Sequence, residues 1–117
     1  MNGQKKILVV GNTRHDGINR YFESVLTKAG YAVETAYDLE GAVRAECDGV
    51  LLTTSLVSSK TGLTLGLAIE ELRERGLPVL LVTSLPEAAE EAKRHGAIIE
   101  EKAPGKDYGA VLKGVFR

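Results

Sequence analysis

The 117-residue chain lacks several features that would assign it to a specialised class of protein. It contains one cysteine and no tryptophan, so it can form neither an internal disulfide nor a cysteine-based zinc site. No apolar run approaches the roughly 20 residues of a membrane-spanning helix, and residues 1–6 are too polar for a signal peptide. The net charge of −1 gives no basic field for nucleic acid. We therefore expect a cytoplasmic protein that binds neither membranes nor nucleic acid.

What the chain does contain is a regular alternation of short apolar runs and amphipathic stretches. The predicted strands are residues 7–10, 31–36, 50–52, 79–82 and 98–99, and the predicted helices are residues 14–29, 39–43, 63–75, 85–95 and 108–116. Five β-α units predict an α/β fold with a doubly wound, five-stranded parallel sheet. Glu34 within its strand indicates a position near the sheet edge. We expect one domain over residues 1–117, with a flexible start at residues 1–4.

Local signals predict where three of these helices begin. Asp38 is a suitable N-cap for the second helix, because its carboxylate can accept a hydrogen bond from the first turn. Thr13 and Asp16 have the spacing of a capping box at the first helix, and Ser84 and Glu87 have it at the fourth. We therefore expect Thr13 and Ser84 to act as N-caps.

Five segments of the chain carry a resemblance to a known family. They are residues 5–10 (KKILVV), 30–36 (GYAVETA), 48–52 (DGVLL), 77–83 (LPVLLVT) and Gly96-Ala97 followed by Lys102 and Pro104. In order and spacing they resemble the receiver domain of bacterial two-component response regulators, over residues 5–116. The resemblance implies the flavodoxin-like receiver topology, (β-α)5, and a role in signal transduction.

The resemblance also marks the positions where a phosphorylation site belongs. Members of the family carry two acidic, metal-binding residues after the first strand, where this chain has Gly11 and Asn12. The third strand of the family ends in the aspartate that accepts phosphate, and the matching residue is Thr53. Thr83 matches the hydroxyl residue of the family, and Lys102 matches its lysine less closely, since it lies nearer to the preceding glycine. We interpret these five residues as a degenerate receiver pocket.

The chemistry of this pocket differs from that of a phosphorylated receiver. Magnesium prefers oxygen ligands that include one or two carboxylates, and Gly11, Asn12 and Thr53 supply none. Phosphoryl transfer depends on that metal, and a threonine without a neighbouring base is a weak nucleophile. We predict no catalytic residue, no metal and no cofactor. An ordinary phosphoacceptor receiver is a less favoured alternative, because the nearby carboxylate, Asp48, precedes its strand and belongs at the opposite edge of the sheet.

The loops that follow the predicted strands are rich in hydroxyl groups, among them Thr13, Thr54 and Ser84. Such residues commonly satisfy loop backbone groups and cap helices. They could also form, with Lys102 or Lys60, a neutral pocket that holds an anion at helix N-termini. The residue types suit both interpretations, so a small-molecule or anion sensor stays open as an alternative function.

The segment of residues 84–116 offers a candidate surface for protein partners. Its fourth helix is apolar mainly through alanine, and it carries the charged residues Glu87, Glu91 and Arg94. Tyr108 is either an exposed aromatic anchor or part of the core stripe of the last helix. Our first hypothesis is a phosphorylation-independent pseudo-receiver that binds a protein partner in a signalling pathway, or forms a homodimer through the last two helices and the fifth strand.

Overall fold

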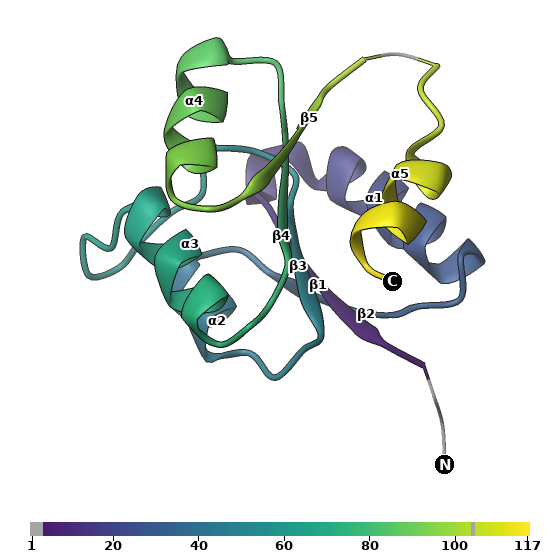
Figure 1. The fold of residues 1–117 in the computed structure, drawn as a ribbon, viewed down its shortest axis with the longest axis horizontal. Helices are drawn as coiled ribbons and strands as arrows, with labels where there is room; N and C mark the ends of the chain where they lie inside the picture. Colours follow the sequence, from purple (N-terminus) through teal and green to yellow (C-terminus); the bar gives the residue numbers. More distant parts are fainter. Residues whose placement is uncertain (1–3, 104) are drawn as a thin grey trace.

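The computed structural model describes residues 4–103 and 105–117, which form one five-stranded, all-parallel sheet flanked by helices (Figure 1). The strand order is β2-β1-β3-β4-β5. The strands are β1 (Lys6–Val10), β2 (Ala32–Ala36), β3 (Gly49–Leu52), β4 (Val79–Thr83) and β5 (Ile98–Glu101), and the helices are α1 (Asp16–Lys28), α2 (Leu39–Arg44), α3 (Leu65–Glu74), α4 (Pro86–Arg94) and α5 (Tyr108–Val115). The predicted fold class is confirmed.

The helices cover the two faces of the sheet in unequal numbers. Helices α1 and α5 pack on one face, and α2, α3 and α4 pack on the other (Figure 1). Strand residues alternate between these two cores, since successive side chains of a strand point to opposite faces. The core under α1 and α5 contains Ile7, Val9, Phe22, Leu26, Leu51, Leu80, Val82, Tyr108, Leu112 and Phe116. Burial on both faces explains the continuous apolar runs of β1, β3 and β4.

The two outer strands are more exposed than the three inner ones. Glu34 on β2 is exposed, which confirms its predicted place at the sheet edge. On the opposite edge, Ile98 of β5 is 47% exposed although it lies within a strand. The central strands therefore hold the core, and the two edges face solvent.

One of the three predicted helix caps is present, and the other two are wrong. Asp38 accepts a hydrogen bond from the Gly41 N–H at 2.6 Å. At the fourth helix, Leu85 and not Ser84 is the N-cap residue, and its side chain makes no capping bond. Pro86 explains the shift, because the residue before a proline is driven to extended backbone, and Leu85 is extended at φ −97° and ψ 112°. Pro86 thus becomes the first helical residue.

The predicted capping box of Thr13 and Asp16 is also absent from the described structure. A short 3-10 turn, η1 (Thr13–His15), precedes α1 and is capped by Asn12, whose side chain accepts from the Arg14 N–H at 2.9 Å. Asn12 acts as the cap in place of Thr13 because an Asn side chain readily accepts a hydrogen bond from the backbone N–H two residues further on. The cap therefore lies one residue earlier than predicted.

Two of the sequence predictions fall wholly or partly outside the described residues. Of the flexible start predicted at residues 1–4, residues 1–3 lie outside the described residues, and Gln4 donates a hydrogen bond to the Gly30 carbonyl at 3.0 Å. Pro104, part of the lysine-proline resemblance, also lies outside them. Within the described ranges, every helix is too short or too polar to cross a membrane.

Candidate functional site

The sheet brings the five residues of the degenerate receiver pocket to the side where the carboxyl ends of its strands lie. We call this side the carboxyl edge of the sheet. Gly11 and Asn12 follow β1, Thr53 follows β3, and Thr83 ends β4, and these three strands are neighbours. Lys102 follows β5, where its backbone N–H donates to the Thr83 carbonyl at 3.2 Å. The carboxyl ends of parallel strands therefore gather the residues as the sequence predicts.

The space between these strand ends is occupied by a residue that sequence reasoning missed. Asn19 of α1 is 1% exposed, and its Oδ1 accepts a hydrogen bond from Thr53 Oγ1 at 2.7 Å. The Thr53 hydroxyl also lies 3.3 Å from the Val10 carbonyl, and Asn19 Nδ2 lies 3.5 Å from the Asn12 carbonyl. The hydroxyl of Thr53, which the sequence resemblance matches to the phosphoacceptor position, is thus engaged with an internal partner.

Gly11 is what allows the Asn19 side chain to enter this space. A Cβ atom on residue 11 would lie 2.0 Å from Asn19 Oδ1 and 2.6 Å from its Cγ, far inside van der Waals contact. An acidic side chain at residue 11 is sterically incompatible with Asn19 in this position. We call Gly11, Asn19 and Thr53 the asparagine plug, since two departures from the receiver pattern and one helix residue form a single packed unit.

A signal for Asn19 was present in the sequence. Asn19, Phe22 and Leu26 are the buried residues of α1, at the spacing i, i+3 and i+7. This is the apolar stripe of an amphipathic helix, and Asn19 is a polar residue on it. A polar residue on a buried stripe needs a hydrogen-bonding partner, and Thr53 provides one.

The edge offers no carboxylate cluster for a metal ion. Among the described residues, no three His, Cys, Asp or Glu side chains are grouped so that they could hold one. Asn12 is engaged through both polar atoms, because its Nδ2 donates to the Leu56 carbonyl at 2.9 Å while its Oδ1 accepts from Arg14. Asp48 lies at the amino ends of the strands, where its carboxylate accepts a hydrogen bond from the Lys6 N–H at 2.9 Å.

Beside the plug lies a small cavity of about 210 Å³, whose lining includes Thr54, Thr83, Ser84 and Lys102. Two of its hydroxyls serve the local backbone. Thr54 Oγ1 accepts from the N–H two residues on at 3.0 Å, and Thr83 Oγ1 does the same at 3.1 Å. Thr13 lies in η1, outside the residues that line this cavity. Structural roles therefore account for Thr54 and Thr83, while Ser84 and Lys102 are exposed.

A second polar centre at the same edge was also missed. Glu40, in the first turn of α2, is 9% exposed. Its carboxylate accepts from the hydroxyls of Ser59 and Thr61, each at 2.6 Å, and from the backbone N–H groups of Lys60 and Thr61 at 3.0 and 3.1 Å. The Ser59 and Thr61 hydroxyls and the Lys60 N–H hold the pKa of Glu40 well below its usual value. We call these residues the Glu40 anchor, because they tie the β3–α3 loop to α2.

The predicted interaction surface is exposed except at its aromatic residue. Glu87, Glu91 and Arg94 of α4 are exposed. Tyr108 is only 6% exposed, its ring centroid lies 5.1 Å from that of Phe22, and its hydroxyl accepts from the Ala103 N–H at 2.9 Å. Tyr108 therefore belongs to the core stripe, and the alternative of an exposed anchor is wrong, because α1 packs against its ring.

Comparison with known proteins relates this geometry to receiver domains by fold. No protein-family model matches the chain, and no curated protein matches it significantly by sequence. Among solved structures, a candidate response regulator from Chloroflexus aurantiacus superposes with a TM-score of 0.75 at 22% identity, covering 97% of this chain and 99% of the other. The chemotaxis protein CheY4 of Vibrio cholerae gives 0.69 at 23% identity, covering 97% and 99%. The receiver domain of NtrX from Brucella abortus gives 0.70 at 27% identity, covering 92% and 93%.

Proposed function

We propose that this protein is a pseudo-receiver, a phosphorylation-independent interaction module in two-component-type signal transduction. The observation that carries the proposal is the asparagine plug. The hydroxyl at the acceptor position is hydrogen-bonded to Asn19 at 2.7 Å, and the Asn19 amide fills the space beside Gly11. The receiver fold supports the signalling context.

Electrostatics support the same conclusion. Receivers use a bound divalent cation to neutralise the charge that develops during phosphoryl transfer. Gly11, Asn12 and Thr53 bring no negative charge to hold such a cation, and desolvating magnesium without carboxylate ligands is costly. Any change of state in this domain must then come from a partner or ligand that prefers one conformation.

The surface that supports protein binding lies on α4 and β5. Leu85, at the start of α4, is 45% exposed, and Ile98 of the edge strand β5 is 47% exposed. Glu87, Glu91 and Arg94 supply charges on the same helix. A partner that covers this surface would bury the two apolar side chains, and the charged residues would contribute to a polar rim. The partner is a signalling protein or a second copy of this chain.

Incubation with acetyl phosphate or beryllofluoride plus magnesium tests the proposal. We expect the melting temperature and the mass of the protein to stay unchanged. The receiver domain of the sensor kinase PA1611 from Pseudomonas aeruginosa, whose structure was solved with magnesium coordinated in its active-site cleft, is the positive control. A covalent phosphoryl group or a clear thermal shift in this chain would overturn the pseudo-receiver assignment.

A second candidate function, an anion sensor, is favoured by the cavity of about 210 Å³ beside the plug, to which Lys102 brings a positive charge. A specific anion would raise the melting temperature by mass action. At low millimolar concentrations, where the general stabilising effect of these salts is small, we expect phosphate or sulfate to raise the melting temperature more than chloride at equal ionic strength if this function is present. Equal melting temperatures in the three salts would exclude it.

A further inference from the structure

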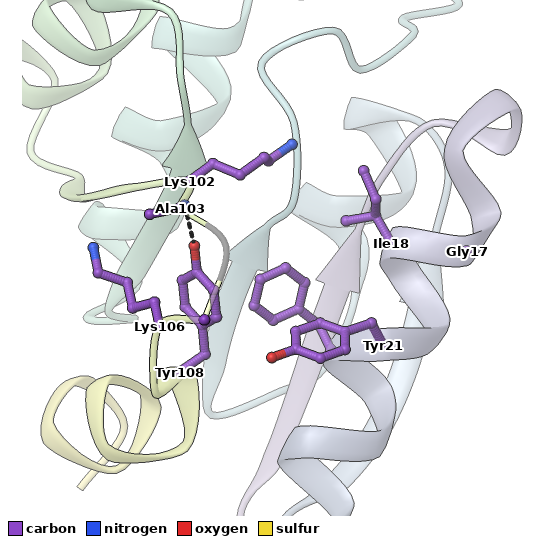
Figure 2. Close-up of a pocket in the computed structure, with 9 residues that line it drawn as sticks. Gly17, Ile18, Tyr21, Lys102, Ala103, Lys106 and Tyr108 are labelled. Atoms are coloured by element: carbon purple, nitrogen blue, oxygen red, sulfur yellow. Dashed lines mark hydrogen bonds between the residues drawn. The ribbon is translucent and has the colours of Figure 1, made fainter.

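A second concave site contains none of the three residues of the asparagine plug. It is a pocket of about 530 Å³ between α1 and the segment that joins β5 to α5 (Figure 2). Its apolar walls come from Ile18, Tyr21, Phe22 and Tyr108. Cavities of 300–1,000 Å³ with mostly apolar walls are typical small-molecule sites. Of the five residues of the degenerate receiver pocket, Lys102 lines this space and the other four do not.

The aromatic walls are held in place by one another and by the backbone. The rings of Tyr21, Phe22 and Tyr108 meet edge to face, with centroids 5.2 Å apart for Tyr21–Phe22 and 5.1 Å apart for Phe22–Tyr108. The Tyr108 hydroxyl is satisfied by Ala103 N–H at 2.9 Å (Figure 2) and by the Glu101 carbonyl at 3.2 Å. Tyr21 is 50% exposed, so its ring is available to a ligand. The walls of this pocket are therefore preformed and offer mainly aromatic ring surface to a ligand.

The charge of the lining is positive. It includes Lys102 and Lys106, and the described lining residues include no Asp or Glu. Lys106 is compensated, because its ammonium lies 3.3 Å from the Glu100 carboxylate and donates to the Glu101 carbonyl at 3.0 Å. The Lys102 ammonium forms no ion pair with any described residue. In Figure 2 the Lys102 side chain extends toward the side of Ile18, whereas that of Lys106 points away from Tyr21.

From this combination we infer that the pocket binds a small aromatic carboxylate, with its ring against Tyr21 and Phe22 and its carboxylate on Lys102. An apolar ring gains free energy by leaving water and by edge-to-face contact with aromatic side chains. An anionic group at the Lys102 end supplies the missing counter-charge and fixes the orientation. This site shares Lys102 with the degenerate receiver pocket, but it uses neither Thr53 nor the α4–β5 surface, on which the proposed pseudo-receiver role rests.

Titration of the full chain with 2-naphthoate, followed by amide NMR, tests the inference. We expect shifts that saturate and that centre on Gly17, Ile18 and the N–H groups around Lys102. The uncharged analogue 2-naphthamide should bind about tenfold more weakly, which corresponds to ~1.4 kcal/mol. Equal affinities for the two compounds, or no saturable shift with naphthoate, would overturn the assignment.

Two matched lysine variants locate the carboxylate. Lys102→Met should lower the affinity for naphthoate about tenfold while leaving that for naphthamide unchanged. Lys113→Met removes the same charge from α5, outside the lining of this pocket, and should leave both affinities unchanged. Both lysines are exposed, so both variants should fold. Equal losses in the two variants would indicate general electrostatic attraction and would contradict the site.

Inorganic phosphate separates this site from the smaller cavity that shares Lys102. At equal concentration, phosphate should not reproduce the naphthoate shifts at Gly17 and Ile18, because it has no apolar surface to bury against the rings. If phosphate reproduces them, the aromatic-carboxylate assignment is wrong. The acetyl phosphate experiment has its own readouts, the mass and the melting temperature of the protein, so the two proposals can fail independently.

Discussion

The asparagine plug and the Glu40 anchor are two polar centres at the carboxyl edge of the sheet. Each satisfies a buried polar side chain with hydrogen bonds, but in a different way. Both place a polar side chain from a helix against groups that follow β3. The plug is neutral and pairs one amide with one hydroxyl. The anchor is ionised and gathers four donated hydrogen bonds from residues 59–61.

The two centres differ in charge, because the anchor contains a carboxylate and the plug contains none. In receivers, acidic residues at this edge serve the metal and the phosphoryl group. In this chain Glu40 is a nearly buried carboxylate at this edge, and hydroxyl and backbone N–H donors satisfy it. Thr53, which the sequence resemblance places at the phosphoacceptor position, instead lies in an uncharged, packed centre. The comparison therefore predicts a plug that depends on shape and is indifferent to pH, and an anchor that depends on charge.

The largest effect is expected from Gly11→Ala, which tests the dependence on shape. The new Cβ would overlap the Asn19 side chain, and overpacking of a buried site costs about 3 kcal/mol at the upper end of its usual range. We expect that loss in the free energy of unfolding measured by urea denaturation. Gly114→Ala is the control, because a Cβ there meets nothing within 4 Å and alanine favours a helix.

A second substitution shows whether the cost of Gly11→Ala arises in the plug. Asn19→Ala removes the atoms that the new methyl group would meet, so Gly11→Ala/Asn19→Ala should be more stable than the sum of the single variants predicts. We expect a coupling of about 2 kcal/mol. Additive losses would mean that Gly11 is required for some reason other than the approach of Asn19.

The next effect concerns Glu40→Gln and its dependence on pH. The folded pKa of Glu40 lies below that of an unfolded glutamate, about 4.3. Its contribution to stability is therefore complete above that pH and is lost as the pH falls. We expect the wild type to lose stability from about pH 5 downward more steeply than Glu40→Gln, and the variant to be less stable at pH 7.

Melting temperatures of the two proteins between pH 7 and pH 3 measure this effect. Glu34→Gln is the matched control, because Glu34 forms an exposed ion pair with Lys6, and such pairs contribute little. Parallel pH profiles for Glu40→Gln and the wild type would contradict the anchor. We expect a smaller loss at pH 7 than for Gly11→Ala, because the loop donors can turn to water.

The sequence predicted the scaffold well because periodicity reports burial. The fully buried strands β3 and β4 appear as unbroken apolar runs, and Asp38 caps α2 as its residue type indicates. The predicted caps at Thr13 and Ser84 were wrong because neighbouring residues determine where these helices begin. Asn12 caps the turn before α1, and Pro86 makes Leu85 the N-cap residue of α4.

The site was predicted only in part, because its key contacts are long-range. Gly11 and Thr53 were recognised as departures from the receiver pattern, but the residue that contacts both is Asn19, which lies 34 residues from Thr53 in the chain. Likewise, Ser59 and Thr61 read as loop hydroxyls until the fold places Glu40 beside them. Sequence spacing cannot report contacts that the parallel crossovers create.

The smallest effect is expected from Thr53→Val, which keeps the shape of the plug and removes its hydroxyl. Asn19 Oδ1 would then be buried without its donor, at a cost of about 1.5 kcal/mol. Urea denaturation measures this loss, and Thr53→Ser, which keeps the hydroxyl, is the comparison that isolates the hydrogen bond from the methyl group. A loss for Thr53→Ser as large as for Thr53→Val would show that packing, not the hydrogen bond, matters there.

Adding Asn19→Leu to Thr53→Val replaces both partners by apolar groups of similar size, and this can be nearly neutral. We therefore expect the double variant to regain most of the stability that Thr53→Val loses. The Glu40 anchor allows no such recovery, because the four donated hydrogen bonds to its carboxylate include two from backbone N–H groups, which substitution to an apolar residue cannot remove. A plug that failed to recover would behave like the anchor, and the distinction between a shape-dependent and a charge-dependent centre would then be lost.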